Sequence, residues 1–299
     1  MVLSAAPSVY TFAAPAKVNL HLSITGRRAD GYHEIVSVAA RLSFGDSLRV
    51  SGLDEGGDRL ECDDPALGTG PDNLVLRALS EFRKRAPLPP LHVALRKRIP
   101  AGAGLGGGSS DAAAALRAAQ RFSERPLEPD ELHAAAAEVG SDCPMFLYDR
   151  PVVLRGRGER VETLPEGVAG TLRGRRVWLV SPGVPIATAD AYAMVANERR
   201  YDSAAVADAA LSKWFKAPEA GLEEFCYNRF TPTIYGKYRY YGALAGVLER
   251  AGLPRCMLSG SGSALFVLPC GPESLFADFE RTVTECLGSS AFRIESTFL

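Results

Sequence analysis

The sequence predicts a mixed α+β protein of two domains. Its 299 residues are enough to bury a sizeable core. Strand-like and helix-like segments follow one another without the regular alternation of a doubly wound parallel sheet, and we find no internal repeat. A loop at 165–170 holds Pro165, Gly167 and Gly170 and precedes a fresh strand. We therefore place a domain boundary near Val168 and predict domains 1–168 and 169–299.

The N-terminal half predicts several alternating strands and three helices. The predicted strands are 12–24, 34–42, 47–51, 91–99, 152–155 and 160–164. The predicted helices are 74–85, 110–122 and 129–139. The first helix begins after Asp72 and Asn73, which are good capping residues, and prolines end it. Residues 54–70 are rich in glycine and aspartate and predict a loop or hairpin connection.

The C-terminal half predicts more helix. Its predicted helices are 188–196, 203–215, 222–225, 238–251 and 273–286, and its predicted strands are 175–181, 256–258, 264–268 and 292–298. Two segments rich in aromatic residues, 213–216 and 235–241, fit two interpretations. They are either core packing or part of the rim of a binding site.

The composition is that of an ordinary globular protein, with 46% hydrophobic and 23% charged residues and a net charge of −1. This balance argues against bulk binding of nucleic acid or membrane. Six scattered cysteines form no CxxC pair and no metal-ligand spacing, which suits a reducing compartment. Residues 1–11 lack a basic n-region and an apolar core, so we expect a cytoplasmic protein without a removed leader.

Five glycines stand among the seven residues from Gly102 to Gly108, and the strongly helix-forming segment 112–120 follows closely. With so little side-chain bulk, backbone N–H groups can approach a ligand closely. Ser109, Ser110 and Asp111 are good capping residues, so we expect the loop to end at a helix N-terminus, where phosphate binds well. The stretch predicts a nucleotide-phosphate site.

Other glycine-rich loops fit less well. Gly102, Gly104 and Gly107 match the dinucleotide pattern GxGxxG, but the strand before them alternates and no buried parallel strand soon follows. The stretch does not match the Walker phosphate-binding loop, because no Lys-Ser/Thr pair follows its last glycine. The stretch is also a poor match to a flexible linker, because a linker does not require the Ser-Ser-Asp sequence and a helix start directly after its glycines. A nicotinamide-binding dehydrogenase therefore remains only as an alternative function, from a different class of enzyme.

Polar side chains gather in two further places. Lys17, Asn19 and His21 recur at every second residue, so they share one face of a strand. Tyr32 and His33 follow Gly31, and together they offer an aromatic face and an imidazole edge, which suit a nucleobase. The first group fits either a site or a solvated surface, and the second also fits a tyrosine and a histidine packed under a loop. Asp142 is interpreted either as the cap of a short helical turn or as a carboxylate beside a reacting hydroxyl.

Six stretches resemble one superfamily, the GHMP kinases of small metabolites. They are 15–20 (PAKVNL), 28–33 (RADGYH), 100–112 (PAGAGLGGGSSDA), 140–144 (GSDCP), 182–188 (PGVPIAT) and 258–263 (LSGSGS). The resemblance runs from about residue 15 to the last strand. It implies an N-terminal domain like the second domain of ribosomal protein S5 and a ferredoxin-like C-terminal domain.

Within that superfamily, Lys17 and Asn19 together with the Asp-Gly-Tyr-His motif resemble the branch that acts on a cytidyl substrate. The resemblance implies ATP-dependent phosphorylation of the 2-hydroxyl of 4-diphosphocytidyl-2-C-methyl-D-erythritol, a step of non-mevalonate isoprenoid precursor synthesis. It implies ATP and Mg²⁺ as cofactors. Lys17 matches the catalytic lysine and Asp142 the catalytic aspartate.

The resemblance also implies the binding residues. The ATP-binding residues are Pro100, Gly102, Gly104, Leu105, Gly106, Gly107, Gly108, Ser109, Ser110, Asn73 and Lys97. The substrate-binding residues are Asn19, Tyr32, His33, Thr188 and Tyr192. The metal ligands stay unassigned. We expect small-molecule partners only, no nucleic acid and no membrane, and a monomer or weak homodimer.

The chain departs from the family pattern at three places. One is Ser141, which replaces the common Ala before Asp142. Asp111 stands where many relatives have Asn, and its negative charge near phosphate has to be offset by lysine or Mg²⁺. Asn228-Arg229-Phe230-Thr231 lacks the two acids of the related motif, so segment 197–237 has no assigned role. Kinases of homoserine or mevalonate and a non-catalytic binding protein remain as alternative functions.

Overall fold

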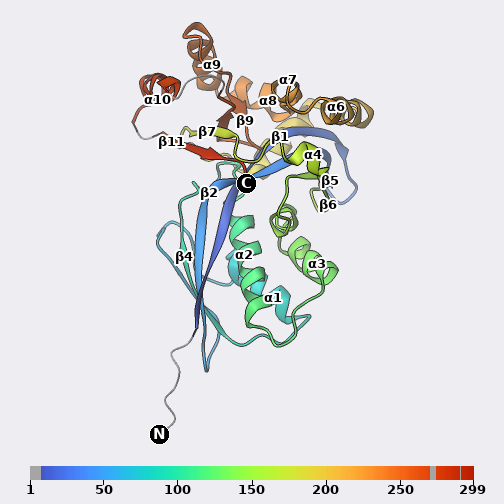
Figure 1. Cartoon of the computed structure of the whole chain (residues 1–299), viewed down its shortest axis with the longest axis vertical. Helices are drawn as coiled ribbons and strands as arrows, with labels where there is room; N and C mark the ends of the chain where they lie inside the picture. The colour runs from blue at the N-terminus through green and yellow to red at the C-terminus, as the bar shows by residue number, and fades with distance from the viewer. Residues whose placement is uncertain (1–7, 270–273, 290) are drawn as a thin grey trace. The chain divides into compact units, whose positions relative to one another are not determined.

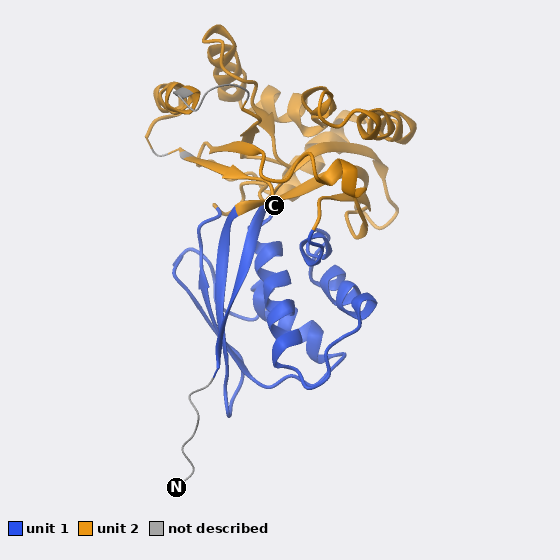
Figure 2. Cartoon of the chain, in the orientation of Figure 1, with its two compact units in different colours: residues 1–16, 44–99, 106–149 blue, residues 17–43, 100–105, 150–299 orange. Residues whose placement is uncertain are grey.

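The computed structural model describes residues 8–269, 274–289 and 291–299, which form two compact units interleaved along the chain (Figure 2). The first unit is Met1–Ala16, Phe44–Ile99 and Gly106–Asp149, and the second is Lys17–Ser43, Pro100–Leu105 and Arg150–Leu299. Two long strands, β1 (Val9–Arg27) and β2 (His33–Gly52), run through both. Val168 lies inside the second unit, and the division into domains 1–168 and 169–299 stays a prediction.

The first unit packs helices against one face of a sheet (Figure 1). Its strands β3 (Arg59–Cys62) and β4 (Leu91–Arg96) extend the order β3-β4-β2-β1, with β4 antiparallel to β2 and parallel to β3. Its helices are α1 (Leu74–Arg83), α2 (Gly107–Phe122), α3 (Pro129–Val139) and the 3₁₀-helix η1 (Pro144–Leu147). Buried aliphatic residues of these strands and helices form one core.

Local sequence explains where these helices begin. The Asn73 side chain accepts a hydrogen bond from the Val75 N–H at 3.0 Å, as predicted for the cap of α1. At α3, Glu128 and Glu131 form a reciprocal capping box and Pro129 occupies the first turn. Alanine makes up most of the buried side of helix α2, which also carries Ser110, Asp111 and Leu116.

The second unit contains the remaining parts of β1 and β2 and a separate four-stranded sheet. β5 (Val152–Gly156) pairs antiparallel with β2, β6 (Arg160–Thr163) pairs with β5, and β8 (Tyr227–Asn228) pairs parallel with β1. The separate sheet has the order β11-β7-β10-β9, with all pairs antiparallel. Its strands are β7 (Arg176–Ser181), β9 (Met257–Leu258), β10 (Leu265–Val267) and β11 (Phe292–Thr297).

Helices of the second unit surround its sheets. They are α4 (Glu166–Ala169), α5 (Thr188–Glu198), α6 (Ala204–Lys216), α7 (Leu222–Phe225), α8 (Phe230–Lys237), α9 (Tyr240–Arg250) and α10 (Ser274–Leu287). The buried indole of Trp178 on β7 contacts Phe279 of α10, with ring centroids 4.9 Å apart. Across the residues that the structure describes, no helix has the length and apolar character needed to cross a membrane.

The predicted α+β class is confirmed, and several element boundaries are corrected. The segment 54–70 contains strand β3, because pairing with β4 supplies the order that its local sequence does not. The predicted strands 34–42 and 47–51 are one strand, β2. Residues 165–170 hold the short helix α4, and α8 was not predicted. Helix α2 begins at Gly107 rather than at Ser110.

Candidate active site

The polar face predicted on β1 exists and is buried. The Lys17 ammonium donates to the Asn19 side-chain oxygen at 2.5 Å, and the Asn19 amide donates to the Ser37 hydroxyl at 2.8 Å. The Ser37 hydroxyl in turn donates to the backbone oxygen of His21 at 2.7 Å. This chain of hydrogen bonds fixes both the position of the lysine and the orientation of the asparagine amide.

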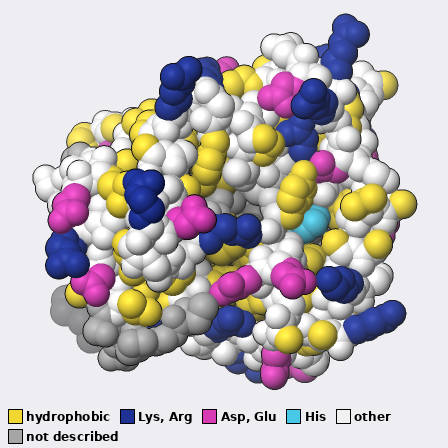
Figure 3. All heavy atoms as spheres, turned by 90° about the horizontal axis from the view of Figure 1, so that it is seen from above, with side chains coloured by type: hydrophobic (Ala, Val, Ile, Leu, Met, Phe, Trp, Pro, Cys, Tyr) yellow, Lys and Arg dark blue, Asp and Glu magenta, His cyan; other side chains and the backbone are white. Residues whose placement is uncertain are grey.

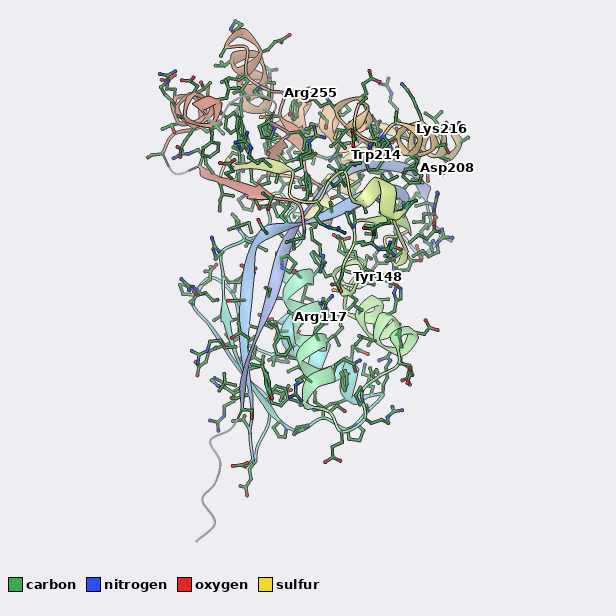
Figure 4. The ribbon with its side chains drawn as sticks, viewed as in Figure 1. Arg117, Tyr148, Asp208, Trp214, Lys216 and Arg255 are labelled. Carbon is green, nitrogen blue, oxygen red and sulfur yellow. The ribbon has the colours of Figure 1, made fainter. Side chains whose placement is uncertain are left out.

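His21, the third residue of that face, takes part in packing. Its ring stacks on Phe225 with centroids 5.0 Å apart, and Phe225 stacks on Trp214 of α6 at 4.3 Å (Figure 4). Burial lowers the pKa of His21, against the opposing effects of the Phe225 backbone oxygen and the Asp202 charge. At Tyr241 of α9 the hydroxyl donates to the Ser263 backbone oxygen at 2.7 Å. These contacts favour the packing interpretation of both aromatic segments.

The turn Ser259–Gly262 lies against Lys17. A Cβ atom on Gly260 would stand 3.1 Å from the Lys17 ammonium and 3.4 Å from the Asn19 side-chain oxygen, and Gly260 has φ +55°. Only glycine fits this position without strain. The Asn228 amide holds the turn, because it donates to the backbone oxygens of Leu258 and Gly260, both at 2.8 Å.

The glycine-rich loop turns its carbonyl groups toward the protein. The oxygens of Gly102, Ala103, Gly104 and Leu105 accept hydrogen bonds from, in order, the Ile186 N–H, the Ala264 N–H, the Ser259 hydroxyl and the Lys17 N–H. In a trans peptide, the carbonyl of one residue and the N–H of the next point in opposite directions. The N–H groups of residues 103–106 therefore point away from these donors, as an anion-binding loop requires.

The loop depends on glycine at three positions. Gly102, Gly104 and Gly106 have φ values of +66°, +73° and +74°. A Cβ atom on Gly104 would stand 2.3 Å from the Ser259 backbone oxygen, which is a direct clash. Side chains larger than hydrogen would therefore displace the turn Ser259–Gly262 as well as strain the loop.

Helix α2 begins directly after this loop. Gly106 is the residue before the first helical turn, and its backbone oxygen accepts from the Ser110 N–H at 2.9 Å. The prediction that Ser109, Ser110 or Asp111 caps the helix was wrong, because left-handed Gly106 starts the helix earlier. The Ser110 hydroxyl is buried and has no hydrogen-bond partner among the described residues. A buried hydroxyl at a helix N-terminus fits a phosphate oxygen.

A buried charged cluster supports the same helix start. The Lys97 ammonium lies 2.5 Å from an Asp46 carboxylate oxygen and 2.7 Å from an Asp111 carboxylate oxygen. Asp46 also accepts from the backbone N–H groups of Arg98 and Ile99, just before the loop. The charge of Asp111 is thus offset by a lysine, one of the two possibilities that the sequence analysis raised.

Burial and neighbouring charges shift the pKa values of Asp111 and Lys97 in this cluster. Burial and the neighbouring Asp46 carboxylate raise the pKa of Asp111 to about 7, although the Lys97 ammonium opposes the shift. Burial by itself would lower the pKa of Lys97, but the Asp111 and Asp46 carboxylates hold it above its ordinary value. The lysine is therefore charged at neutral pH, and its ammonium is engaged by the protein itself.

Gly107, Gly108 and Asn73, which are also predicted to bind ATP, pack closely against or hydrogen-bond with other parts of the protein. A Cβ atom on Gly107 would stand 3.3 Å from the Lys97 ammonium, and one on Gly108 would stand 3.3 Å from Leu74. Asn73 caps α1 and donates to the Gly68 backbone oxygen at 2.7 Å. Pro100 begins the loop. The roles of all of these residues in binding ATP stay predictions.

Asp142 lies in the turn between α3 and η1. Its side chain is half-buried. Burial, opposed by a hydrogen bond from Ser109 and assisted by the Asp142 charge, raises the pKa of the neighbouring Cys143 thiol to about 12. The residue at the start of η1 is Cys143, so the interpretation of Asp142 as the cap of this helical turn was wrong. Its catalytic role stays a prediction.

An aromatic cluster surrounds His33 in the second unit. The His33 ring stacks on Tyr192 of α5 with centroids 4.8 Å apart, and Tyr192 packs edge-on against Phe230 at 4.9 Å. The Nε2 atom of His33 is buried and without a hydrogen-bond partner among the described residues. Burial, together with the charge of Arg27, lowers the pKa of His33, which favours a neutral ring at neutral pH.

Tyr32 and Thr188 occupy other positions in the same unit. The Tyr32 side chain is 50% exposed, and the Arg157 guanidinium lies over its ring at 4.9 Å. The Thr188 hydroxyl lies 3.1 Å from the Ser261 hydroxyl, at the start of α5. The structure therefore brings His33 together with Tyr192, and it places Tyr32 under a cation that the sequence analysis did not identify.

Sequence reasoning missed several residues of these clusters. Ser37, Asp46 and Asn228 are polar and buried, and only Ser37 has apolar neighbours on both sides in the sequence. Their signal, a polar residue within an otherwise apolar strand or at a strand end, does not identify a partner. Tyr201 lies in a segment without a recognisable motif, and its ring is tilted toward His33 with centroids 6.1 Å apart.

The described residues hold no group of three or more His, Cys, Asp or Glu side chains that is arranged to bind a metal ion. A magnesium ion that arrives on nucleotide phosphates keeps several waters and does not require such a group. On the face drawn in Figure 3, basic, acidic and hydrophobic side chains are interspersed. Such a mixture differs from the continuous basic surface of a nucleic-acid-binding protein.

Comparison with known proteins points in one direction. The model of the GHMP kinases N terminal domain matches residues 73–150. A protein of Parabacteroides distasonis named 4-diphosphocytidyl-2-C-methyl-D-erythritol kinase is 33% identical over 268 residues, which cover 88% of this chain and 94% of that protein. A protein of the same name from Synechococcus sp. (strain CC9902) is 35% identical over 86% of this chain and 87% of its own.

Solved structures agree with this result. A crystal structure of 4-(cytidine 5'-diphospho)-2C-methyl-D-erythritol kinase superposes with a TM-score of 0.74 and 32% identity, covering 97% of this chain and 99% of the other. Homoserine kinase from Cytophaga hutchinsonii gives a TM-score of 0.74 at 18% identity, over 100% of this chain and 97% of the other. The second likeness concerns the fold alone. The predicted GHMP kinase fold is confirmed.

Proposed function

The chain belongs to the 4-diphosphocytidyl-2-C-methyl-D-erythritol kinases, a family of GHMP kinases, and we propose that it phosphorylates 4-diphosphocytidyl-2-C-methyl-D-erythritol with ATP. The phosphoryl group goes to the 2-hydroxyl, and ADP is the second product. The observation that supports a kinase most directly is the loop at 102–106, which turns its carbonyl groups toward the protein and ends at the N-terminus of α2. That arrangement suits polyphosphate.

Asp142, Lys17 and Asn19 are the residues proposed to act in the transfer. The 2-hydroxyl oxygen of the substrate attacks the γ-phosphorus of ATP, the bond to the bridging oxygen of ADP breaks, and the Asp142 carboxylate accepts the hydroxyl proton. The Lys17 ammonium stabilises the negative charge that develops on the reacting oxygens. Asn19, whose amide is oriented by Ser37, orients the acceptor.

The phosphates of ATP are proposed to bind along the glycine-rich loop. The N–H groups that follow the loop carbonyls and the buried Ser110 hydroxyl fit phosphate oxygens. Ser109 supplies a second hydroxyl, and Lys97 lies beside Gly107 with its ammonium paired to Asp46 and Asp111. Mg²⁺, bound to the phosphate oxygens, would neutralise part of their charge. We assign no protein ligand to the ion.

The cytidyl group is proposed to bind at the aromatic cluster. Tyr32 and Tyr192 would contact the base faces, while the neutral His33 ring offers one donor and one acceptor for the base edge. Because His33 Nε2 is covered in the free protein, base binding requires a neighbouring side chain to turn aside. Thr188 lies at the start of α5, beside Ser261 of the turn. The protein would act in the cytoplasm as a monomer or weak homodimer.

A coupled assay of ADP release tests this proposal. The purified protein is offered ATP and Mg²⁺ with 4-diphosphocytidyl-2-C-methyl-D-erythritol, and mevalonate and homoserine serve as alternative acceptors. We expect turnover with the cytidyl substrate alone. Turnover with another alcohol would keep the kinase class and overturn the substrate. No turnover with any acceptor, or protection from unfolding by NAD instead of ATP, would overturn the kinase assignment.

A further inference from the structure

Residues 199–203, between α5 and α6, are held in place on both sides of Tyr201. On one side, the Arg229 guanidinium donates to the Arg200 backbone oxygen through Nε at 3.0 Å and Nη2 at 2.8 Å. On the other side, the Asp202 N–H donates to the Ile24 backbone oxygen at 2.8 Å. The Ile24 N–H in turn donates a hydrogen bond to the Asp202 carboxylate at 3.1 Å. The backbone at Tyr201 is therefore fixed to β1.

Arg229, which anchors this segment, carries a charge whose burial costs free energy. The Arg229 side chain is 7% exposed, and it forms ion pairs with Glu198 at 3.0 Å and Asp202 at 3.9 Å. Glu198 also accepts from the Thr233 hydroxyl at 2.7 Å. A guanidinium removed from water stabilises a structure only when several partners satisfy it. This network rigidly positions one short segment, and that segment contains an aromatic residue.

The Tyr201 side chain nevertheless remains 36% exposed. A large aromatic side chain that is held by its backbone but not buried presents a ready contact surface to a ligand. Its ring lies 6.1 Å from the His33 ring, with an angle of 48° between the planes. His33 thus has Tyr192 stacked on it and Tyr201 tilted toward it, and its buried Nε2 lacks a partner among the described residues.

From this geometry we propose that Tyr201 is a further specificity-determining residue, whose ring contacts the pyrimidine base that His33 binds. The inference rests on the proposed cytidyl substrate. Because its backbone is fixed, Tyr201 responds to the base only through its two side-chain torsions, so little order has to be gained on binding. Its phenol ring replaces water beside the imidazole, which strengthens the hydrogen bond between His33 and the base.

Binding of cytidine 5'-diphosphate to the wild type and to Tyr201→Ala tests the proposal, with ADP titrated in parallel. Base–aromatic contacts are worth about 1–3 kcal/mol, so we expect cytidine diphosphate to bind about 5- to 160-fold more weakly to the variant. The Michaelis constant for the cytidyl substrate should rise in proportion. The turnover number and the affinity for ADP should stay within about twofold of the wild type.

Two further variants separate contact from damage. Tyr201→Phe keeps the ring and should bind cytidine diphosphate like the wild type. Val206→Ala removes an apolar side chain of α6 that is 68% exposed and should leave all constants unchanged. Unaltered binding of cytidine diphosphate to Tyr201→Ala, or an equal loss of ADP affinity, would overturn the inference about Tyr201. Failure of the wild type to bind cytidine diphosphate would instead overturn the proposed substrate.

Discussion

Two buried polar clusters of this protein differ in what satisfies them. In the first unit, the Lys97 ammonium lies between the carboxylates of Asp46 and Asp111. In the second unit, the His33 ring stacks on Tyr192 and lies near the tilted ring of Tyr201, and its Nε2 has no partner among the described residues. The first cluster neutralises its cation with charges of the chain itself. Each cluster has one buried polar atom without a partner among the described residues, Asp111 Oδ1 in the first and His33 Nε2 in the second, but only the first is held by ion pairs.

This difference separates residues that stabilise the fold from residues that bind a ligand. Removing one member of a buried ion pair leaves an uncompensated charge, so substitutions in the first cluster should reduce stability. An unpaired nitrogen beside partly exposed rings is already costly in the free protein. A ligand that pairs with it removes that cost, so substitutions in the second cluster should mainly reduce affinity.

The largest effect is expected for Asp142, the proposed acceptor of the proton of the reacting hydroxyl. Asp142→Asn removes the proposed proton acceptor but keeps the shape of the side chain, so turnover should fall about 10²–10⁴-fold. Binding of ATP and the midpoint of thermal unfolding should stay near the wild-type values. Steady-state kinetics and a thermal melt on the same preparation measure both. A loss of stability with little loss of turnover would assign Asp142 to the fold.

Lys97→Met tests whether the charged cluster stabilises the fold. The substitution leaves Asp46 and Asp111 buried without their cation, which should cost about 3–5 kcal/mol of unfolding free energy. Chemical denaturation measures the loss. Arg117→Met is the matched control, because Arg117 of α2 forms an exposed ion pair with Asp149 at 3.1 Å (Figure 4). That variant should lose no more than about 1 kcal/mol.

The two outcomes for Lys97 are distinct. Unchanged stability combined with a strong loss of ATP affinity would show that Lys97 serves the nucleotide rather than the fold. Reduced stability with nearly normal ATP affinity, measured under conditions where the variant is folded, would assign it to the cluster.

The pH dependence of stability should depend on Asp111. Its pKa rises from 3.8 in the unfolded chain to about 7 in the folded protein, so the folded state binds more protons between these values. Stability therefore falls as pH rises through this window, by about 2–4 kcal/mol between pH 4 and pH 8. Asp111→Asn cannot titrate and should flatten the decline. Denaturation at several pH values measures it, and equal slopes for the two proteins would contradict the assignment.

Tyr32→Ala should have the smallest effect of this series. The ring is half exposed and packs beneath Arg157, so the fold loses little. Binding of the cytidyl substrate should weaken by about 1–3 kcal/mol, as expected for one lost base stack, while ATP affinity stays unchanged. Calorimetric titration of each ligand measures the difference. If both affinities fell together, Tyr32 would not be a base-stacking residue.

Much of the fold followed from local patterns. Helix α1 begins after the predicted capping residue Asn73, and α3 occupies the predicted range 129–139, since helix signals act within a few residues. Strand β3 was missed because its order comes from parallel pairing with β4, more than thirty residues later in the chain. The start of α2 was misplaced because left-handed Gly106 competes with three good polar caps.

The candidate site followed from sequence only in part. The polar face of β1 was predictable from period two, and Lys17 does contact Asn19. The partner of Lys97 was not, because Asp46 lies 51 residues away and no pattern links the two. Asn228, which holds the turn Ser259–Gly262, was equally invisible, since its role depends on two backbone oxygens rather than on side chains.

By itself, the sequence determined the α+β class, the phosphate-binding character of the glycine-rich loop and the kinase family, because each depends on residues that are neighbours in the chain. Only the tertiary structure decided that Lys97 is engaged by two acids and that Tyr201 stands beside His33. Those relations depend on burial and on contacts between distant segments. The free energy of such contacts arises when folding excludes water, and no local pattern records it.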